Sequence, residues 1–445
     1  MIAIFEYDTI VKYQVTAICR EPLHIGSAVG DRSEVLVHPV DDMPFVQASS
    51  ISGVFRNYYT KAYGEKAANE LFGSAETEEN GLSAGSKIRF SDGRFLKGEQ
   101  GIKLELRPRV KIDAESGTAA EGSKFNVEYI GAGAKIQFSV YLYGAGYEQN
   151  IEDVFAAMDC QVIQLGGQKS NGCGYLQMEK LLYRSFDMKN ENDRALWFRE
   201  EELEEKDYED RKPYLNEKAK YQNAYDIIVT GQTEGELLVK SAVVTDYGEK
   251  SPDSMNMRNA KKEYIIPGSS FKGTIRNQME MIAEYIGVSD IIGDTFGIPE
   301  QKGQKGATGN IRFFDTVIGD VEENDKMPIS HRIHIDKFTG GVMQQGLFSE
   351  KNVAGKLSFR ISIQNKNHPE RTCGLLLMAL RDLAIGTVNV GSGYNVGKGI
   401  IQVEQIHLEK GGVENAAADI FFQSEQGIQD SKNIIGECMQ AIRRG

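Results

Sequence analysis

The sequence predicts an α+β protein built from two tandem ferredoxin-like domains. Two observations support this prediction: a series of short motifs occurs twice in the same order, and in each copy helix-like stretches separate paired strand-like stretches. Helices that punctuate paired strands are typical of a β-α-β-β-α-β unit rather than of a doubly wound parallel sheet. A chain of 445 residues is also too long for one ordinary core, so two domains are expected.

Each copy opens with a serine motif. The pattern Ser-Ser-x-x-Gly-x-x-Arg-Asn occupies residues 49–57 and recurs at residues 269–277. In the second copy a buried strand breaks at a Pro-Gly pair and a helix starts, so Ser269 or Ser270 is well placed as its N-cap. Backbone N–H groups in the first turn of a helix attract phosphate, so this end of the helix is a candidate anion-binding site.

Two cations strengthen this candidate in the second copy. Lys272 and Arg276 lie four residues apart, so they share one face of the helix. The first copy keeps Arg56 but has Ser52 where the second copy has the lysine. These residues are compatible with a phosphate clamp, weaker in the first copy, and on their own they favour a simple capped helix with solvated cations.

The remaining landmarks follow in one order in both copies. In each pair of ranges the first copy comes first. A Phe-Gly pair (72–73 and 296–297) is followed by an Ile-Arg-Phe strand (88–90 and 311–313) and by an Arg-x-x-Ile-Asp segment (109–113 and 332–336). A further strand (134–142 and 355–363), a helix, and a glycine-rich turn that leads into a strand (166–179 and 391–404) complete each copy. Chance does not reproduce such a series, so we infer a tandem duplication with copies at about 1–185 and 224–410.

The glycine-rich turns follow a helix rather than precede one, so they are neither Walker nor dinucleotide-binding loops. Gly172 in the first copy corresponds to Gly397 in the second. Glycine allows positive φ and the close approach of a ligand backbone, and Lys169 and Lys398 add positive charge to the two turns.

Negative charge is concentrated in one segment. The net charge is −13, and residues 200–210 hold eight acids and one lysine, a local charge of −7. Charges packed this densely predict a solvated linker or exposed helix, which we place at 186–223, with Trp197 docked against a domain. A locally basic groove elsewhere remains compatible with the net charge because salt screens distant charges.

Residues 411–445 are expected to form a helical tail, with one apolar face at Ile420, Phe421, Ile428, Ile434 and Ile435.

Cysteine and histidine are sparse. Five scattered cysteines without a C-x-x-C pair predict reduced thiols rather than zinc or disulfides. His331 and His334 fall on opposite faces of a predicted strand, so they cannot share one metal ion. The first residues include Glu6 and Asp8 and do not resemble a signal peptide, and no apolar run is long enough to cross a bilayer, so a cytoplasmic protein without a membrane partner is expected.

Three segments of the second copy, "PGSSFKGTIRN", "RIHIDKFTGGVMQQGLF" and "GSGYNVGKGII", resemble the repeat-associated mysterious protein (RAMP) superfamily of CRISPR systems. The backbone subunits of type III effector complexes are the most similar. The first copy is similar through "PFVQASSISGVFRN", "RPRVKIDAESG" and "GGQKSNGCGYLQ". The resemblance covers nearly the whole chain except the acidic segment and the tail, and it identifies the chain as a tandem fusion of two RAMP domains.

The resemblance implies RRM-like cores that bind a guide RNA and projecting thumb hairpins that splay the duplex of guide and target RNA. It implies as partners the guide RNA, complementary target RNA and other type III subunits: the large signature subunit, the small subunit and further RAMP subunits. Thumb residues would be Arg109, Arg332, His334 and Phe338, with Phe348 either a wedge or a core residue. The predicted RNA-binding residues are Ser49, Ser50, Arg56, Lys169, Gly172, Ser269, Ser270, Lys272, Arg276, Gly397 and Lys398.

The resemblance also implies metal-dependent cleavage of target RNA by an aspartate in the loop before each serine motif. Asp31 is the candidate in the first copy, and Asp253 or Asp246 is the candidate in the second. Asp31 and Asp253 would hold a divalent cation, magnesium or manganese, together with phosphate oxygens of the RNA. The spacing does not choose between Asp246 and Asp253, nor does it say which copy cuts.

Three other functions are compatible with the same residues. The chain could be a non-catalytic scaffold that holds guide RNA. A guide-processing ribonuclease would need acid–base groups, but His24 of the first copy has Val239 at the equivalent place in the second. A duplicated small-molecule binder would carry no RNA on purification.

Overall fold

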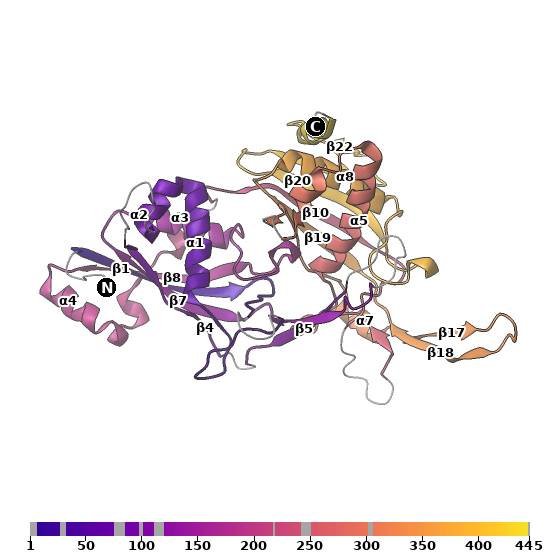
Figure 1. Ribbon diagram of the computed structural model, residues 1–445, viewed down its shortest axis with the longest axis horizontal. Helices are drawn as coiled ribbons and strands as arrows, with labels where there is room; N and C mark the ends of the chain where they lie inside the picture. Colours follow the sequence, from indigo (N-terminus) through magenta and orange to yellow (C-terminus); the bar gives the residue numbers. More distant parts are fainter. Residues whose placement is uncertain are drawn as a thin grey trace. The chain divides into compact units, whose positions relative to one another are not determined.

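The computed structural model describes residues 7–26, 33–74, 85–97, 101–110, 120–216, 219–241, 251–300 and 306–443. The chain forms two compact units (Figure 1). Unit one consists of Met1–Leu104, Glu128–Lys169 and Cys173–Gln222, and unit two of Glu105–Val127, Ser170–Gly172 and Asn223–Gly445. Unit two therefore contains two short segments of the first repeat.

Unit one is an antiparallel sheet with helices on one face. Its central strand β1 lies between β7 and β8, and β3 and β4 both pair with β7. The bounds are β1 Thr9–Cys19, β2 Phe45–Val46, β3 Ile88–Phe90, β4 Gly93–Phe95, β7 Lys135–Tyr143, β8 Leu176–Asp187, α1 Ala48–Tyr63, α2 Glu65–Phe72 and α3 Glu148–Asp159. This strand order, with a helix after β1 and another after β7, is that of a ferredoxin-like unit.

Unit two repeats this topology. Strand β10 lies between β19 and β20, β15 pairs with β19, and all these pairs are antiparallel. The bounds are β10 Asn223–Glu234, β15 Ile311–Phe313, β19 Lys356–Gln364, β20 Ile400–Lys410, α5 Gly268–Ile286, α6 Ile291–Phe296 and α8 Pro369–Ala384. The predicted α+β class is confirmed, and the topology agrees with the ferredoxin-like prediction.

Alternation of side chains explains both cores. In β1 the residues Val11, Tyr13 and Val15 are buried at every second position, beneath the helices. The ring of Tyr13 lies 5.2 Å from that of Phe155 in α3, centroid to centroid. In unit two, Phe271 of α5 stacks on Phe359 of β19 at 4.0 Å. Period-two burial against helices is what makes a one-sided sheet stable.

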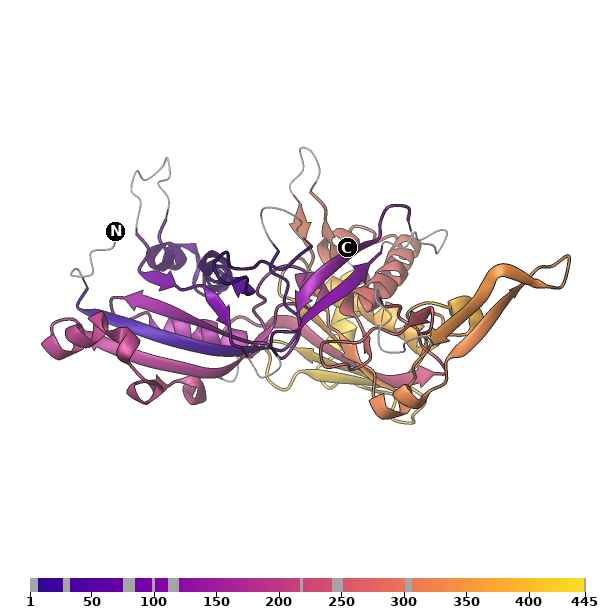
Figure 2. The same cartoon turned by 90° about the horizontal axis from the view of Figure 1, so that it is seen from below.

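Two β-hairpins leave these cores. The first consists of β5 Leu104–Arg109 and β6 Phe125–Ile130. The second consists of β17 Ser330–Ile335 and β18 Val342–Lys351, and β11 Ser254–Met255 pairs in parallel with the base of β18. Figure 2 shows β17–β18 extending well beyond the rest of its unit. The shorter elements are β12 Ile265–Ile266, β13 Gly297–Ile298, β14 Ala307–Thr308, β16 Thr316–Val317 and α7 Val321–Lys326.

The acidic segment is folded, so of the two predicted forms the solvated linker is wrong and the exposed helix agrees in part: Glu200–Glu202 and Glu205–Asp207 are short 3-10 helices, and Glu202 and Glu205 are exposed. It forms α4 Glu191–Phe198 and β9 Glu209–Asp210, which pairs with β8. The expected docking of Trp197 is confirmed, because its buried ring lies 5.3 Å from Phe186 and 5.8 Å from Tyr141. Helix α4 lies on the sheet face opposite α1–α3 (Figure 1). The indole anchor and ion pairs such as Lys12–Glu200 at 3.3 Å offset the repulsion between the acids.

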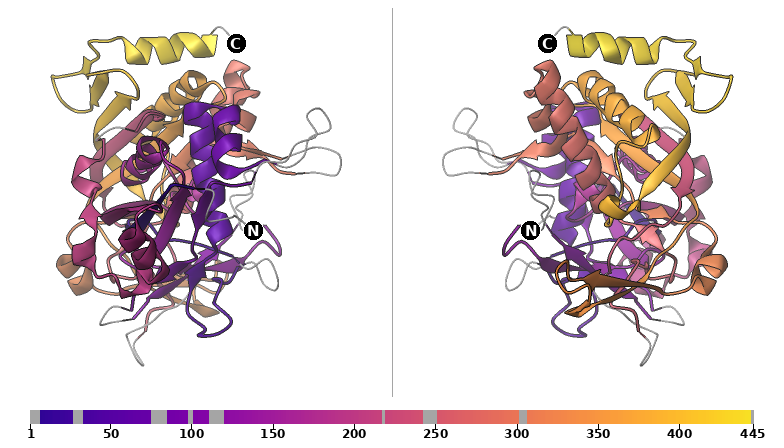
Figure 3. Two further views of the ribbon diagram at one scale, coloured as in Figure 1. Left: turned by 90° about the vertical axis from the view of Figure 1, so that its left-hand side faces the viewer. Right: turned by 90° about the vertical axis from the view of Figure 1, so that its right-hand side faces the viewer.

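The tail is helical only at its end, so that prediction is half wrong. Strands β21 Ala417–Phe421 and β22 Ile428–Gln429 extend the unit-two sheet beyond β20, and α9 spans Ile434–Arg443. Ile420 pairs with Ile406 because an edge strand offers unpaired backbone groups. Helix α9, yellow in Figure 3, packs on α8, where a Cβ added to Gly374 would lie 2.6 Å from the carbonyl oxygen of Cys438. Among the helices of the described ranges, none is long and apolar enough to cross a membrane.

Candidate nucleic-acid interface

An aspartate, and not a serine, caps the motif helix of unit two. Helix α5 starts at Gly268, and its N-cap residue Pro267 makes no side-chain hydrogen bond. The Gly268 N–H donates to Asp315 Oδ1 at 2.9 Å. Ser269 and Ser270 lie within the first turn, so the predicted N-cap role is wrong. Their position in the first turn still places them at the positive end of the helix.

Unit one has the same arrangement. Helix α1 starts at Ala48, whose N–H donates to Asp92 Oδ1 at 2.7 Å. Ser49 and Ser50 lie in the first turn. Arg56 Nη2 donates to Asn69 Oδ1 at 2.7 Å, so the one cation of this motif is already held by α2.

A cluster of four cations surrounds the middle of the second motif. Lys272 is largely buried, and its Nζ donates to Ser170 Oγ at 2.9 Å. Burial, followed by the positive charges of Arg276, Arg312 and Arg109, lowers the pKa of Lys272 to about 8. We call Lys272, Arg276, Arg312 and Arg109 the Lys272 cluster. Because like charges crowd a desolvated amine here, an anion would be bound favourably.

Other contacts fix two of the arginines. Arg276 pairs with Glu280 at 2.7 Å and lies over the ring of Phe296 at 5.2 Å. Arg312 donates to the carbonyl oxygens of Gly309 and Ile311, at 2.8 and 2.7 Å. Sequence reasoning missed Arg312, although the repeated Ile-Arg-Phe strand was a usable signal.

The glycine turn of the first repeat packs on the start of α5. A Cβ on Gly172 would lie 2.5 Å from the carbonyl oxygen of Phe313, and a Cβ on Gly268 would lie 2.9 Å from that of Asn171. The described contacts of Gly172 are thus with protein backbone rather than with an open surface. The Lys169 carbonyl accepts a hydrogen bond from Gln164 Nε2 at 2.8 Å, which fixes the start of the turn.

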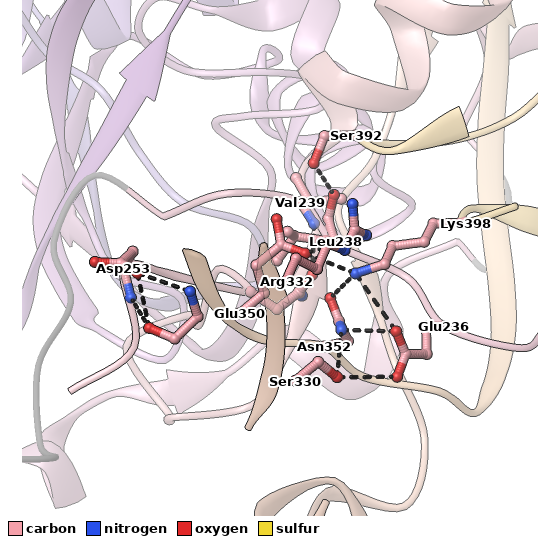
Figure 4. A network of polar contacts seen from close by, with 12 residues as sticks. Glu236, Leu238, Val239, Asp253, Ser330, Arg332, Glu350, Asn352, Ser392 and Lys398 are labelled. Atoms are coloured by element: carbon pink, nitrogen blue, oxygen red, sulfur yellow. Dashed lines mark hydrogen bonds and ion pairs between the residues drawn. The ribbon is translucent and has the colours of Figure 1, made fainter. Parts of the chain in front are cut away.

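In the glycine turn of the second repeat, Gly397 is open to a ligand and Lys398 is buried. A Cβ added to Gly397, which has φ +77°, would meet nothing within 4 Å, so a ligand backbone can approach it. Lys398 is 5% exposed and binds Glu350 at 2.8 Å, Asn352 at 2.7 Å and Glu236 at 3.4 Å (Figure 4). The predicted RNA contact of Lys398 is therefore wrong, because its charge is used to tie the turn to hairpin β17–β18.

The hairpin itself presents exposed side chains. Phe338 is 97% exposed at its tip, and His334 and Phe348 are exposed on its strands. Core packing is excluded for Phe348. Arg332 pairs with Glu350 at 3.2 Å, which links it to the Lys398 network (Figure 4).

Of the three candidate aspartates, only Asp253 lies within the described residues, and Asp31 and Asp246 lie outside them. Asp253 is exposed at the base of β17–β18, where its Oδ2 accepts hydrogen bonds from Ser349 N at 2.7 Å and Ser349 Oγ at 2.8 Å. These bonds, and to a smaller extent the charge of His331, lower the pKa of Asp253. Sequence reasoning did not anticipate Ser349.

A metal ion does not fit these residues alone. In the part of the chain that the structure describes, no group of three His, Cys, Asp or Glu side chains could hold a metal ion. Asp253 offers a single carboxylate, and one of its oxygens is held by Ser349. Divalent cations need more oxygen ligands than this.

Comparison with known proteins shows the family of the chain. The model of the RAMP superfamily matches residues 16–177 and 236–402, more than half of the sequence. The chain belongs to the RAMP superfamily. Because the model matches twice, once in each repeat, the chain carries two RAMP domains.

Two further likenesses are partial. A stretch of 75 residues is 32% identical to the CRISPR system CMR subunit Cmr6 of Saccharolobus solfataricus, which is 16% of this chain and 26% of that protein. The chain thus matches about a quarter of this curated relative. A chain in the structure of a Type III-B Cmr-beta bound to cognate target RNA is similar over 39% of this chain and 61% of its own length, with 17% identity and a TM-score of 0.33.

Proposed function

We propose that the chain is a guide-RNA-binding backbone subunit of a type III CRISPR ribonucleoprotein. The observation that carries this proposal is the Lys272 cluster at the start of α5. A phosphate there would receive one ammonium and adjacent guanidinium groups near the positive end of α5, and it would relieve their mutual repulsion. Contacts of this kind bind an RNA backbone without reading its sequence, as a guide of variable sequence requires.

Membership of the RAMP superfamily and the likeness to a CMR subunit support this proposal. By the same reasoning the partners would be guide RNA, complementary target RNA, and the large, small and other RAMP subunits of such a complex. The exposed Phe338 on a projecting hairpin has the form of a wedge that stacks against an unpaired base.

We further propose that Asp253 serves cleavage of target RNA. It is exposed, its pKa is lowered so that it is ionised at neutral pH, and it lies at the base of the hairpin that would splay the duplex. The ionised carboxylate of Asp253 would lie beside the phosphate of a splayed nucleotide. Magnesium or manganese would supply electrostatic stabilisation of that phosphate, but since the described residues do not hold an ion alone, RNA oxygens must complete its ligands.

A non-catalytic scaffold is the second candidate function. The solitary carboxylate and its engagement by Ser349 favour it. Asp253→Ala, Asp31→Ala and Asp246→Ala in the assembled complex separate the two candidates, with Glu322→Ala as an exposed acidic control. Loss of cleavage at regularly spaced sites in an aspartate variant, and in metal-free buffer, supports catalysis. Cleavage by all variants as by the wild type leaves the scaffold.

RNA binding is tested on the purified protein. It should carry RNA of uniform length, and Lys272→Met should reduce the amount while Lys432→Met, an exposed lysine in the tail, should not. Protein that never carries or binds single-stranded RNA contradicts both candidate functions.

A further inference from the structure

The sheet face of unit one that does not carry α1–α3 holds a row of cations around a tyrosine. Side chains alternate along a strand, and Val11 and Tyr13 of β1 belong to the core beneath the helices, so Lys12 points to the other face. The register of β1, β3, β7 and β8 then fixes a row across four strands, which we call the cation row: Arg89, Tyr141, Lys12 and Arg184. Three of its four side chains are cations.

Aromatic side chains fill the next row of the same face. Tyr143 and Phe186 lie opposite Ile10, one on each side of β1, and these three belong to an apolar cluster separate from the core beneath the helices. In the cation row itself, the guanidinium of Arg89 lies 4.4 Å from the ring centroid of Tyr141. Rings interleaved with cations on a sheet stack the bases and hold the phosphates of a single strand. The face thus has the composition of a nucleic-acid platform.

The acidic segment covers this face with groups that resemble such a ligand. The ring of Trp197 lies 5.3 Å from Phe186 and 5.8 Å from Tyr141, where a base would stack. A carboxylate oxygen of Glu200 lies 3.3 Å from Lys12 Nζ, and the other accepts from the Tyr141 hydroxyl at 3.1 Å, where a phosphate would bind. One indole and one carboxylate therefore take the places of a base and its phosphate.

The segment does not satisfy the whole row. Arg184 Nη1 donates to the Asp207 carbonyl at 2.6 Å, but Arg184 Nε is buried and has no hydrogen-bond partner among the described residues. Arg89, at the end of the row, is exposed. Strand β9 pairs with β8 through two residues and lies at the edge of the sheet, so detaching the segment breaks no pairing between other strands.

The second repeat differs at this row. The register of unit two places in the equivalent positions Arg312, Ser362, Asp226 and Glu409. The tyrosine has become a serine, and two of the three cations have become acids. The side chain of Asp226 is 38% exposed, whereas that of Lys12, its equivalent, is 11% exposed. The acidic cover therefore belongs to the repeat whose row is basic and aromatic.

We propose that the cation row and the rings beside it bind single-stranded nucleic acid, and that the acidic segment is an autoinhibitory contact that the strand displaces. Segment and strand compete because they offer the same chemistry to the same side chains. Stacking and backbone contacts do not read sequence, so a strand of any sequence fits. The inference goes beyond the proposed function, because it adds a surface in unit one that uses none of the Lys272 cluster.

Trp197 is the only tryptophan of the chain, so its fluorescence reports on the segment. The test titrates a 12-nucleotide oligouridine, and separately a 12-nucleotide oligodeoxythymidine, into the full chain carrying Lys272→Met and Arg276→Gln. These changes remove the proposed phosphate site, so the result does not depend on that proposal. We expect saturable binding with a shift of the emission to longer wavelength, because the indole leaves the apolar cluster for water. A shift with either strand supports the inference, and the difference between them measures the contribution of the 2′-hydroxyl.

Two matched substitutions in the same background each remove one negative charge from the segment. Glu200→Gln releases Lys12 and should lower the Kd of the strand about tenfold, the factor of one charge-assisted hydrogen bond. Glu202→Gln, which changes an exposed acid, should alter the Kd less than about twofold. Arg89→Gln leaves the contacts of Lys12 and Arg184 with the segment in place and should weaken binding about fivefold.

Three results would overturn the inference. If neither strand shifts the Trp197 emission up to about 1 mM, in the Glu200→Gln variant as well, the segment is a permanent part of the fold. Equal Kd values for Glu200→Gln and Glu202→Gln would mean that the segment does not compete through Lys12. Unchanged binding by Arg89→Gln would place the strand outside the cation row.

Discussion

Helices α1 and α5 begin in the same way but differ in charge. In each case one residue separates a short strand from the helix, the first turn carries two serines, and the first N–H of the helix donates to an aspartate. Yet α5 bears Lys272, desolvated among arginines, while α1 has Ser52 at that place and its Arg56 is bound to Asn69. Both repeats keep the same helix start, but the cations are concentrated in the second. We therefore place the proposed phosphate site in the second repeat.

The largest effect is expected from the buried ion pairs of Arg107 with Glu105 and Asp315. Arg107→Met leaves Glu105 and Asp315 buried without their cation, so the free energy of unfolding should fall by about 3–5 kcal/mol. The comparable change in the first repeat, Arg94→Met, removes only an exposed ion pair and should lower it by less than about 1 kcal/mol. Urea unfolding of the full-length variants measures both. Equal losses would mean that the buried pairs of Arg107 and the exposed pair of Arg94 do not differ as described.

The second prediction concerns RNA affinity. Lys272→Met combined with Arg276→Gln should weaken binding of single-stranded RNA on the order of 100-fold, since bonds to charged groups each contribute about 1.5–3 kcal/mol. Arg56→Gln should weaken it less than about threefold, because that arginine is engaged by Asn69. Filter binding at one fixed salt concentration compares the two. An equal loss from both changes would move the main phosphate contact out of the second repeat.

A pH dependence sharpens the same contrast. The pKa of Lys272 lies at about 8 in the folded chain, below the ordinary lysine value. RNA binds the charged amine, so affinity should be constant below that pKa and fall as pH rises through it, by about tenfold from pH 7 to pH 9. The unfolded chain binds more protons above pH 8, so stability without RNA should rise with pH there. In Lys272→Met both dependences should disappear.

The smallest expected effect is a gain. Ser52→Lys places in α1 the cation that α5 already has. One added phosphate contact to a single strand should steepen the salt dependence of binding by about 0.7 in the slope of log K against log salt. Ser52→Met, which adds bulk without charge, is the control. An unchanged slope in Ser52→Lys would show that α1 does not face the RNA.

The duplicated fold could be predicted from sequence because its signals are local. Strands such as β7 and β19 alternate their burial, and the motifs punctuate them. The cluster around Lys272 was visible only in part. Arg276 is one helical turn away, but Arg109 and Ser170 approach from residues far earlier in the chain.

The burial of individual polar side chains could not be predicted from the sequence. A lysine beside a glycine turn reads as exposed, yet Lys398 is enclosed by Glu350, Glu236 and Asn352. The serines of the motif have the composition of a helix cap, but an aspartate 47 residues after Gly268 takes that place. Long-range partners of this kind leave no periodic trace in a single sequence.

The central claim is that an RNA phosphate lies in the Lys272 cluster, and a titration of Lys272 tests it most directly. In protein labelled with ¹³C at the lysine Cε, the signal missing from Lys272→Met reports the pKa of that amine. The account predicts a pKa of about 8 without RNA and a value raised above the ordinary lysine range of about 10.4 when guide-length RNA is bound. A pKa that RNA binding leaves unchanged would contradict it.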